Sequence, residues 1–195
     1  MDDLQNILKF TKLINKFQQV RRHYHANGED RMENDVEHSY ELAMLAWYII
    51  FIKKINLNLD LVIKYALVHD LVEVYAGDTY AHTTDTELKE NKIEREETAL
   101  KKLRGEFTEF PEIFGLIEEY NRKENLESKF VYALDKIEPI FDIYTNNGRT
   151  WKERKITIDM IIDIKKDKVK LDPEIERLFY EILKVLRKEE EDIFN

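Results

Sequence analysis

The chain has 195 residues, a length that fits one domain of ordinary size. Its formal net charge of −9 disfavours nonspecific binding to DNA, which needs a basic face, so we expect no nucleic-acid partner. Cysteine is absent, which excludes disulfides, a thiolate nucleophile and a cysteine zinc site. Any metal must therefore be bound by nitrogen and oxygen ligands.

The composition favours an all-α fold. The chain contains only three prolines and five glycines, too few for a protein rich in turns, while 43% of its residues are hydrophobic and can build a packed core. No convincing run alternates apolar and polar residues with period two. We expect one all-α domain over residues 1–195, with seven or eight helices.

The expected helices follow the hydrophobic period in chain order. A first helix covers residues 3–20, and a polar loop follows over 21–35. A second helix runs from an N-cap at Asn34 or Asp35 to about residue 54. Five further expected helices lie at 60–77 with Asp60 as cap, 86–104, about 111–121, 126–145 and 151–166, and a last one with Pro173 in its first turn at 173–191.

The expected compartment is the cytoplasm, without a membrane partner. The first residues, MDDLQNILKF, lack the basic and apolar regions of a signal peptide. The most apolar stretch, LAMLAWYIIFI at residues 42–52, is too short to span a bilayer. Three aromatic side chains, Trp47, Tyr48 and Tyr65, are expected in the core rather than stacked on a base.

The segment YALVHDLVEVYAGD reads as a buried helix but carries four ionisable groups. Burying charge is costly unless the charges are paired or bind a metal. His69 and Asp70 would lie about 100° apart on a helix, and Glu73 would share their face. Asp78 follows the expected helix end, where a loop can fold it back over the site.

Two other apolar helices each carry one isolated side chain of a metal-binding type. The segment ENDVEHSYELAMLA contains His38, and KFVYALDKIEPIF contains Asp135. Taken singly, each histidine is more often a hydrogen-bonded core residue. Together with His69 and Asp70, these side chains could supply four ligands to one divalent cation, and imidazole with carboxylate suits Zn, Mn, Fe, Co or Ni.

The order His38, His69-Asp70, Asp135 resembles the HD-domain metal-dependent phosphohydrolases. The longer motifs ENDVEHS, ALVHDLVEVYAGD and ALDKIEP resemble the branch that contains the bacterial 5′-deoxynucleotidases and their eukaryotic relatives. The resemblance implies a helical bundle of the HD-domain type around one divalent cation (Mn, Co, Zn, Fe, Ni or Mg). It places the core motifs at 31–139, with the C-terminal helices 151–191 packed on them.

By this resemblance, the four residues bind the metal, and the expected reaction is hydrolysis of the phosphomonoester of a (deoxy)nucleoside 5′-monophosphate. Glu73 and Asp78 match acidic residues near the attacking water and the leaving group. Glu73 is the better candidate to orient or deprotonate the water, and Asp78 to protonate the leaving oxygen, although the two roles could be exchanged. A homodimer is also expected for this family.

A phosphate dianion needs cationic partners in an acidic protein. Arg31, which precedes ENDVEHS, is one candidate. Lys16 and Phe17 stand where the 5′-deoxynucleotidases have an Arg-Trp pair that contacts sugar and phosphate. Lysine keeps the charge but loses the forked guanidinium, so selectivity against a ribose 2′-hydroxyl stays open.

Several alternatives stay open. The substrate could be another small phosphate ester, a nucleoside triphosphate or a guanosine polyphosphate. The chain could also be a noncatalytic metal- or nucleotide-binding module, or a metal-free helical scaffold, although Glu73 and Asp78 count against a noncatalytic role. His23 and His25 are expected on a surface loop, and His82 either faces the substrate or is a plain loop residue.

Overall fold

The computed structural model describes residues 2–83 and 85–194. Helices dominate these ranges and one small antiparallel hairpin accompanies them, so the expected all-α class is confirmed. The helices are α1 (Asp3–Phe17), α2 (Asp35–Lys53), α3 (Leu59–Val68), α4 (Glu73–Ala76), α5 (Thr86–Glu90), α6 (Lys92–Glu106), α7 (Pro111–Arg122), α8 (Leu126–Thr145), α9 (Arg149–Arg154), α10 (Ile158–Val169), α11 (Pro173–Lys188) and α12 (Glu190–Phe194). The described ranges therefore contain twelve helices rather than seven or eight. Each of the helices expected at 60–77, 86–104 and 151–166 is divided into two, and α12 is additional.

The segment expected as a polar loop contains a β-hairpin instead. Strand β1 (Arg21–His25) pairs antiparallel with β2 (Met32–Asn34). Asn34 then caps α2, as one of the two expected caps: its side chain accepts the backbone N–H groups of Val36 and Glu37, and the Glu37 side chain accepts the N–H of Asn34. The hairpin therefore leads directly into the helix that carries His38.

The single helix expected over residues 60–77 is wrong. Asn58, not Asp60, caps α3, and α3 ends at Val68. His69 is the C-cap of α3 and keeps helical dihedrals, and Asp70 lies in the turn that leads to the short helix α4. Gly77 ends α4 with φ 74°, a conformation that suits glycine, and directs the chain into the loop that carries Asp78.

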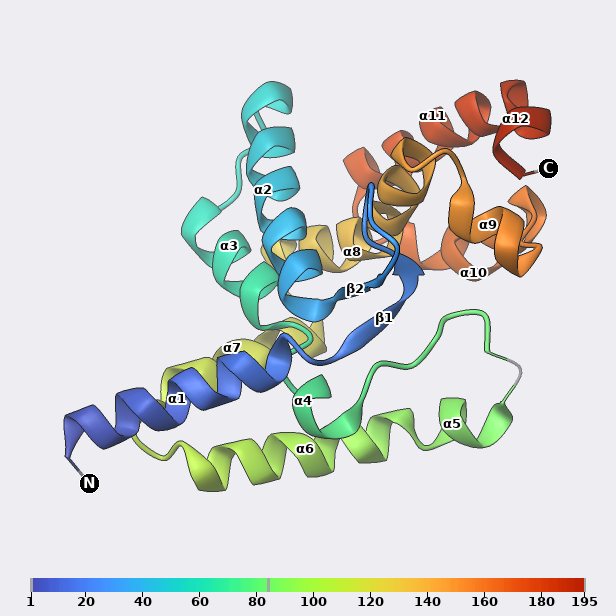
Figure 1. Cartoon of the computed structure of the whole chain (residues 1–195). Coiled ribbons are helices and arrows are strands. Elements are labelled where there is room, and N and C mark those ends of the chain that lie inside the picture. The colour runs from blue at the N-terminus through green and yellow to red at the C-terminus, as the bar shows by residue number, and fades with distance from the viewer. Residues whose placement is uncertain (1, 84, 195) are drawn as a thin grey trace.

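The long helix α8 runs through the middle of the molecule, with α2, α3 and α7 on one side and α10 and α11 on the other (Figure 1). Its apolar side chains belong to the larger of two core clusters. The smaller cluster lies between α1, α4, α6 and α7. Because Ala66 belongs to the larger cluster and Val68 and Leu71 to the smaller, the His69-Asp70 turn lies where the two clusters meet.

The expected core aromatics divide into buried and exposed residues. Tyr65 is fully buried, as expected, but Trp47 and Tyr48 are exposed on the outer face of α2. The expectation for these two residues is wrong, because α2 packs through its other face. In the described ranges, no helix has the length and apolar character needed to cross a membrane.

Candidate metal centre and cavity

Three separate segments bring two histidines and two aspartates together. His38 comes from α2, the His69-Asp70 pair from the turn after α3, and Asp135 from α8; one ligand atom from each lies within 4.8 Å of all the others. Nε2 of His38 is 3.2 Å from Oδ1 of Asp135, and Nε2 of His69 is 3.0 Å from Oδ2 of Asp70. The four side chains therefore face a common point.

The Nδ1 atom of each histidine ring, which faces away from the common point, contacts a neighbouring polar group. Nδ1 of His69 donates to the backbone carbonyl of Ala66 at 2.9 Å, and Nδ1 of His38 lies 3.0 Å from the Glu138 carboxylate. Metal-binding histidines are commonly oriented by such contacts. Nε2 of His69 is buried and faces the carboxylates of Asp70 and Asp135, at 3.0 Å and 3.8 Å. This inward-facing nitrogen, together with two carboxylates, fits a divalent cation.

The two aspartates keep their negative charge despite being largely buried. Burial favours the neutral form of Asp70, but the neighbouring His69 and Arg22 hold its pKa well below the usual range. Burial likewise opposes ionisation of Asp135, and Lys136 with the two histidines more than offsets that effect and lowers its pKa. Both residues can therefore act as anionic ligands at neutral pH.

Glu73 and Asp78 lie next to this centre. Glu73 is 3% exposed, and its Oε2 has no hydrogen-bond partner among the described residues. Burial, reinforced by the charges of Asp70 and Asp78, raises the pKa of Glu73 well above its usual value. Asp78 lines the same cavity, with Oδ2 3.7 Å from Nε2 of His23. The carboxyl groups of Glu73 and Asp78 thus border one space beside the centre.

Sequence analysis missed Asp35, which it considered only as a helix cap. Carboxylate oxygens of Asp35, Asp70 and Glu73 lie within 4.8 Å of one another. Asp35 is fully buried, at the first turn of α2. Its position one turn before His38 on α2 was the signal that could have placed it at the site.

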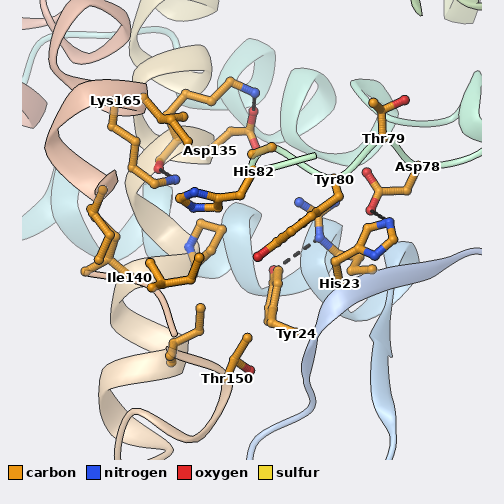
Figure 2. A pocket seen from close by; sticks show the side chains of 18 of the residues that line it. His23, Tyr24, Asp78, Thr79, Tyr80, His82, Asp135, Ile140, Thr150 and Lys165 are labelled. Atoms are coloured by element: carbon orange, nitrogen blue, oxygen red, sulfur yellow. Dashed lines mark hydrogen bonds and ion pairs between the residues drawn. The ribbon is translucent and has the colours of Figure 1, made fainter. Parts of the chain in front are cut away.

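The centre forms one end of a cavity of about 460 Å³ (Figure 2). The carboxylates of Asp70, Glu73, Asp78 and Asp135 line that end. The opposite end is apolar, and the side chains that line it are Ile140, Ile143, Trp151, Ile156 and Ile161. A cavity with one charged and one apolar end suits a ligand that combines an anionic group with a flat or apolar body.

Arg22 is the second functional residue that sequence analysis missed, because it lies in the segment assigned to a loop. Its Nη1 lies 2.9 Å from Oδ2 of Asp70 and 3.4 Å from Oδ1 of Asp35. Lys92 lies 3.9 Å from Oε1 of Glu73, and Lys136 pairs with Asp135. Cations thus border the carboxylates and line the cavity wall.

The three expected substrate contacts are not brought to this cavity. Arg31 pairs with Glu29 and Glu37. Lys16 is exposed and lies over the ring of Tyr75, and Phe17 is buried in the smaller core cluster.

The histidines outside the centre divide between the cavity and the surface. His23 and His82 both line the cavity; His23 lies on β1 rather than in a loop, and its side chain is 39% exposed, as expected for a surface residue (Figure 2). The two rings also lie on either side of Tyr80, with centroids 4.9 Å and 5.5 Å from it. His25 instead pairs with Glu153 at 2.7 Å.

A helical bundle with a buried centre of two imidazoles and two carboxylates defines a metal-binding protein of the hydrolytic kind. The particular family is identified by comparison: the HD domain family matches residues 14–176, and the chain belongs to it. The expected resemblance is therefore confirmed.

Named relatives agree with this assignment. The chain is 34% identical over 139 residues to 5′-deoxynucleotidase HDDC2 of Homo sapiens, covering 70% of this chain and 66% of that protein, just under two thirds of its length. The protein of the same name from Dictyostelium discoideum is 31% identical over 171 residues, covering 82% and 88%. A crystal structure described as a predicted metal-dependent phosphohydrolase from Magnetospirillum magnetotacticum superposes with a TM-score of 0.77 at 26% identity, covering 92% and 90%.

Proposed function

We propose that the chain is a metal-dependent phosphohydrolase that cleaves the phosphomonoester of a (deoxy)nucleoside 5′-monophosphate. The observation that carries the proposal is the meeting of His38, His69, Asp70 and Asp135 at the charged end of a cavity whose far end is apolar. A nucleotide has the matching polarity, with a phosphate at one end and a base at the other. The names of the HDDC2 relatives support the same substrate class.

His38, His69, Asp70 and Asp135 would hold the cation. When bound, a divalent cation supplies a Lewis acid that polarises the phosphoryl group and lowers the pKa of water. Glu73 would orient the attacking water and take its proton, and the burial beside other carboxylates that raises its pKa supports this role. Asp78, which lines the same cavity from the loop after Gly77, would protonate the leaving 5′-oxygen, or the two residues would exchange these roles.

Arg22, Lys92 and Lys136 are the cations best placed to receive the phosphate. Each is paired with a carboxylate of the site in this structure and also lines the cavity. An entering phosphate dianion would share these cations, which lowers the cost of bringing it beside several carboxylates. Of the contacts expected from sequence, Arg31, Lys16 and Phe17 remain predictions for a substrate-bound arrangement that differs from this one.

An activity matrix of metals against substrates tests the proposal. Protein stripped and reloaded with Mn, Co, Zn, Fe, Ni or Mg is assayed for phosphate release from each ribo- and deoxynucleoside monophosphate, nucleoside triphosphates, a guanosine polyphosphate and a sugar phosphate. We expect release from monophosphates with at least one metal and none without metal. A substrate optimum outside the monophosphates contradicts the proposed substrate class, and metal-independent or absent hydrolysis contradicts the enzyme assignment.

We also propose that the chain acts as a homodimer through the outer face of α2. Six large apolar side chains are exposed there at helical spacing: Tyr40, Met44, Trp47, Tyr48, Phe51 and Ile52. Self-pairing of this face would bury on the order of 800 Å² per protomer, the size of a standard interface. Light scattering of the wild-type protein should give the mass of a dimer. Phe51→Glu should convert the dimer to a monomer, whereas Ile93→Glu on α6 should leave the dimer intact. A monomeric wild type contradicts the proposal.

The remaining expectations are proposals as well. We propose that residues 1–195 work as one domain, because α8 packs against both the helices before it and those after it. The absence of cysteine is compatible with a reducing, cytoplasmic setting. The net charge of −9 supports a small-molecule rather than a nucleic-acid partner.

A further inference from the structure

The loop that follows α4 carries Asp78 and borders the cavity. Asp78, Thr79 and Tyr80 all line the cavity from this loop. Gly77, with φ 74°, turns the chain into the loop, and the N–H of Thr83 donates to the carbonyl of Tyr80 at 3.0 Å. That bond lies within the loop, so it shapes the segment without fixing the segment to a helix.

Arg95 on α6 holds this loop on both sides of Asp78. Its Nη1 donates to the backbone carbonyl of Ala76 at 2.6 Å, and its Nη2 donates to Oγ1 of Thr79 at 2.8 Å. Nη2 also donates to the carbonyl of Leu88 in α5, at 3.2 Å. Ala76 lies two residues before Asp78 and Thr79 lies one residue after it. One guanidinium therefore ties both flanks of Asp78 to a helix.

Helical spacing explains why Arg95 points toward the loop. Ala99 and Leu103, four and eight residues further along α6, are buried in the smaller core cluster, so Arg95 shares the packed face of the helix. That face contacts α4, and Figure 1 shows the two helices side by side. Because the core fixes α6, Arg95 is attached to a rigid element.

Arg95 is separated from the reacting groups. It is half-buried and lines a small hollow together with Tyr75 and Lys102. It is not among the described residues that line the cavity of the metal centre. Any effect of Arg95 on a bound substrate must therefore pass through the loop that it holds.

We propose that Arg95 is a positioning residue for the reaction and that it acts through Asp78. The inference rests on the proposed phosphohydrolase function, in which the Asp78 carboxyl transfers a proton. The planar guanidinium bridges two acceptors in a fixed geometry, which keeps this carboxyl beside the metal centre. A displacement of about 1 Å at a reacting group can lower the rate by about 100-fold.

A double-mutant cycle tests whether Arg95 acts through Asp78. kcat and KM for phosphate release from a deoxynucleoside 5′-monophosphate are measured for wild type, Arg95→Gln, Asp78→Asn and the double variant. We expect Arg95→Gln to lower kcat about 10- to 100-fold, with KM within about twofold of wild type. In the Asp78→Asn background the same change should alter kcat by less than about twofold, because the positioned carboxyl is gone. Equal kcat for Arg95→Gln and wild type, or an equal factor in both backgrounds, overturns the proposal.

Three controls separate positioning from a general loss of structure. Arg95→Lys keeps the charge but reaches one acceptor at a time, so it should recover part of the kcat that Arg95→Gln loses. Arg104→Gln, at an exposed position of α6, is the matched control and should keep the wild-type kcat. Arg95→Gln should also keep the wild-type metal content by elemental analysis. Loss of the metal would place the effect at the metal centre and overturn the proposal.

Cleavage of the loop by chymotrypsin gives a measurement that needs no hydrolase activity. We expect cleavage after Tyr80, followed by mass spectrometry, to be several times faster in Arg95→Gln than in wild type or Arg104→Gln, because the released loop opens more often. Equal cleavage rates for Arg95→Gln and wild type overturn the proposal. A wild type that releases no phosphate contradicts the phosphohydrolase proposal instead, so the two failures are distinguishable.

Discussion

Nε2 of His38 lies 3.2 Å from Oδ1 of Asp135, although 97 residues separate them in the chain. The contact joins α2 to α8, and the turn between α3 and α4 completes the site with His69 and Asp70. Because the two helices belong to the main core, the stability of the fold and the geometry of the centre depend on the same packing.

Replacing Glu73 by glutamine should separate chemistry from metal binding. The variant keeps the shape of the side chain but cannot take a proton, so kcat should fall about 10²- to 10⁴-fold. Metal content, measured by elemental analysis, should remain that of wild type. Glu97→Gln, at an exposed position of α6, is the matched control and should keep full activity. An active Glu73→Gln enzyme would remove Glu73 from the proton transfer.

Replacing Arg22 by lysine should weaken substrate binding. The guanidinium reaches Asp35 and Asp70 at once, a geometry that an ammonium group cannot reproduce. We expect KM to rise about tenfold, the cost of roughly one charge-assisted hydrogen bond. Arg21→Lys, on the exposed side of the same strand, should keep the wild-type KM. Equal KM values for the two variants would exclude Arg22 as a phosphate contact.

Lys165 makes stability depend on pH. Burial, with repulsion from Lys136, lowers the pKa of Lys165 from 10.5 to about 7. The unfolded chain therefore binds one more proton than the folded chain between about pH 7 and 10.5, so the free energy of unfolding should rise with pH across that window. Denaturant unfolding of Lys165→Met should lack this rise, whereas the exposed Lys166→Met should retain it. Parallel pH profiles for wild type and Lys165→Met would contradict the assignment.

Gly148 should tolerate no larger residue. Its φ is 69°, and an added Cβ would collide with the backbone carbonyl of Ile193 in α12. Gly148→Ala should lower the free energy of unfolding by about 2 kcal/mol or more, since strain and the displacement of α12 add. Gly105→Ala, in α6 with open space around it, should be neutral or stabilising by up to about 1 kcal/mol. A neutral Gly148→Ala would show that α12 does not pack there.

The metal centre was predictable because its ligands lie in strongly apolar segments, where an unpaired charge is costly. The hairpin was not, because RRHYH has no alternating apolar pattern and β1 is anchored by distant groups, such as the Thr150 hydroxyl that accepts the N–H of His25. The end of α3 at Val68 could not be predicted either. Residues 60–77 have a helical pattern, but residues on the two sides of His69 belong to different core clusters. Arg22 was missed because its position depends on the hairpin, whereas Asp35 lies one turn before His38 on α2 and was considered only as a cap.

The metal content of purified protein tests the central claim most directly. Elemental analysis of wild type, Asp135→Asn and the exposed control Asp163→Asn, each purified without chelator, is compared with phosphate release from nucleoside monophosphates. We predict about one transition-metal equivalent and activity in wild type and control, and loss of both in Asp135→Asn. Equal metal content in Asp135→Asn and wild type would show that the four side chains do not form the metal centre.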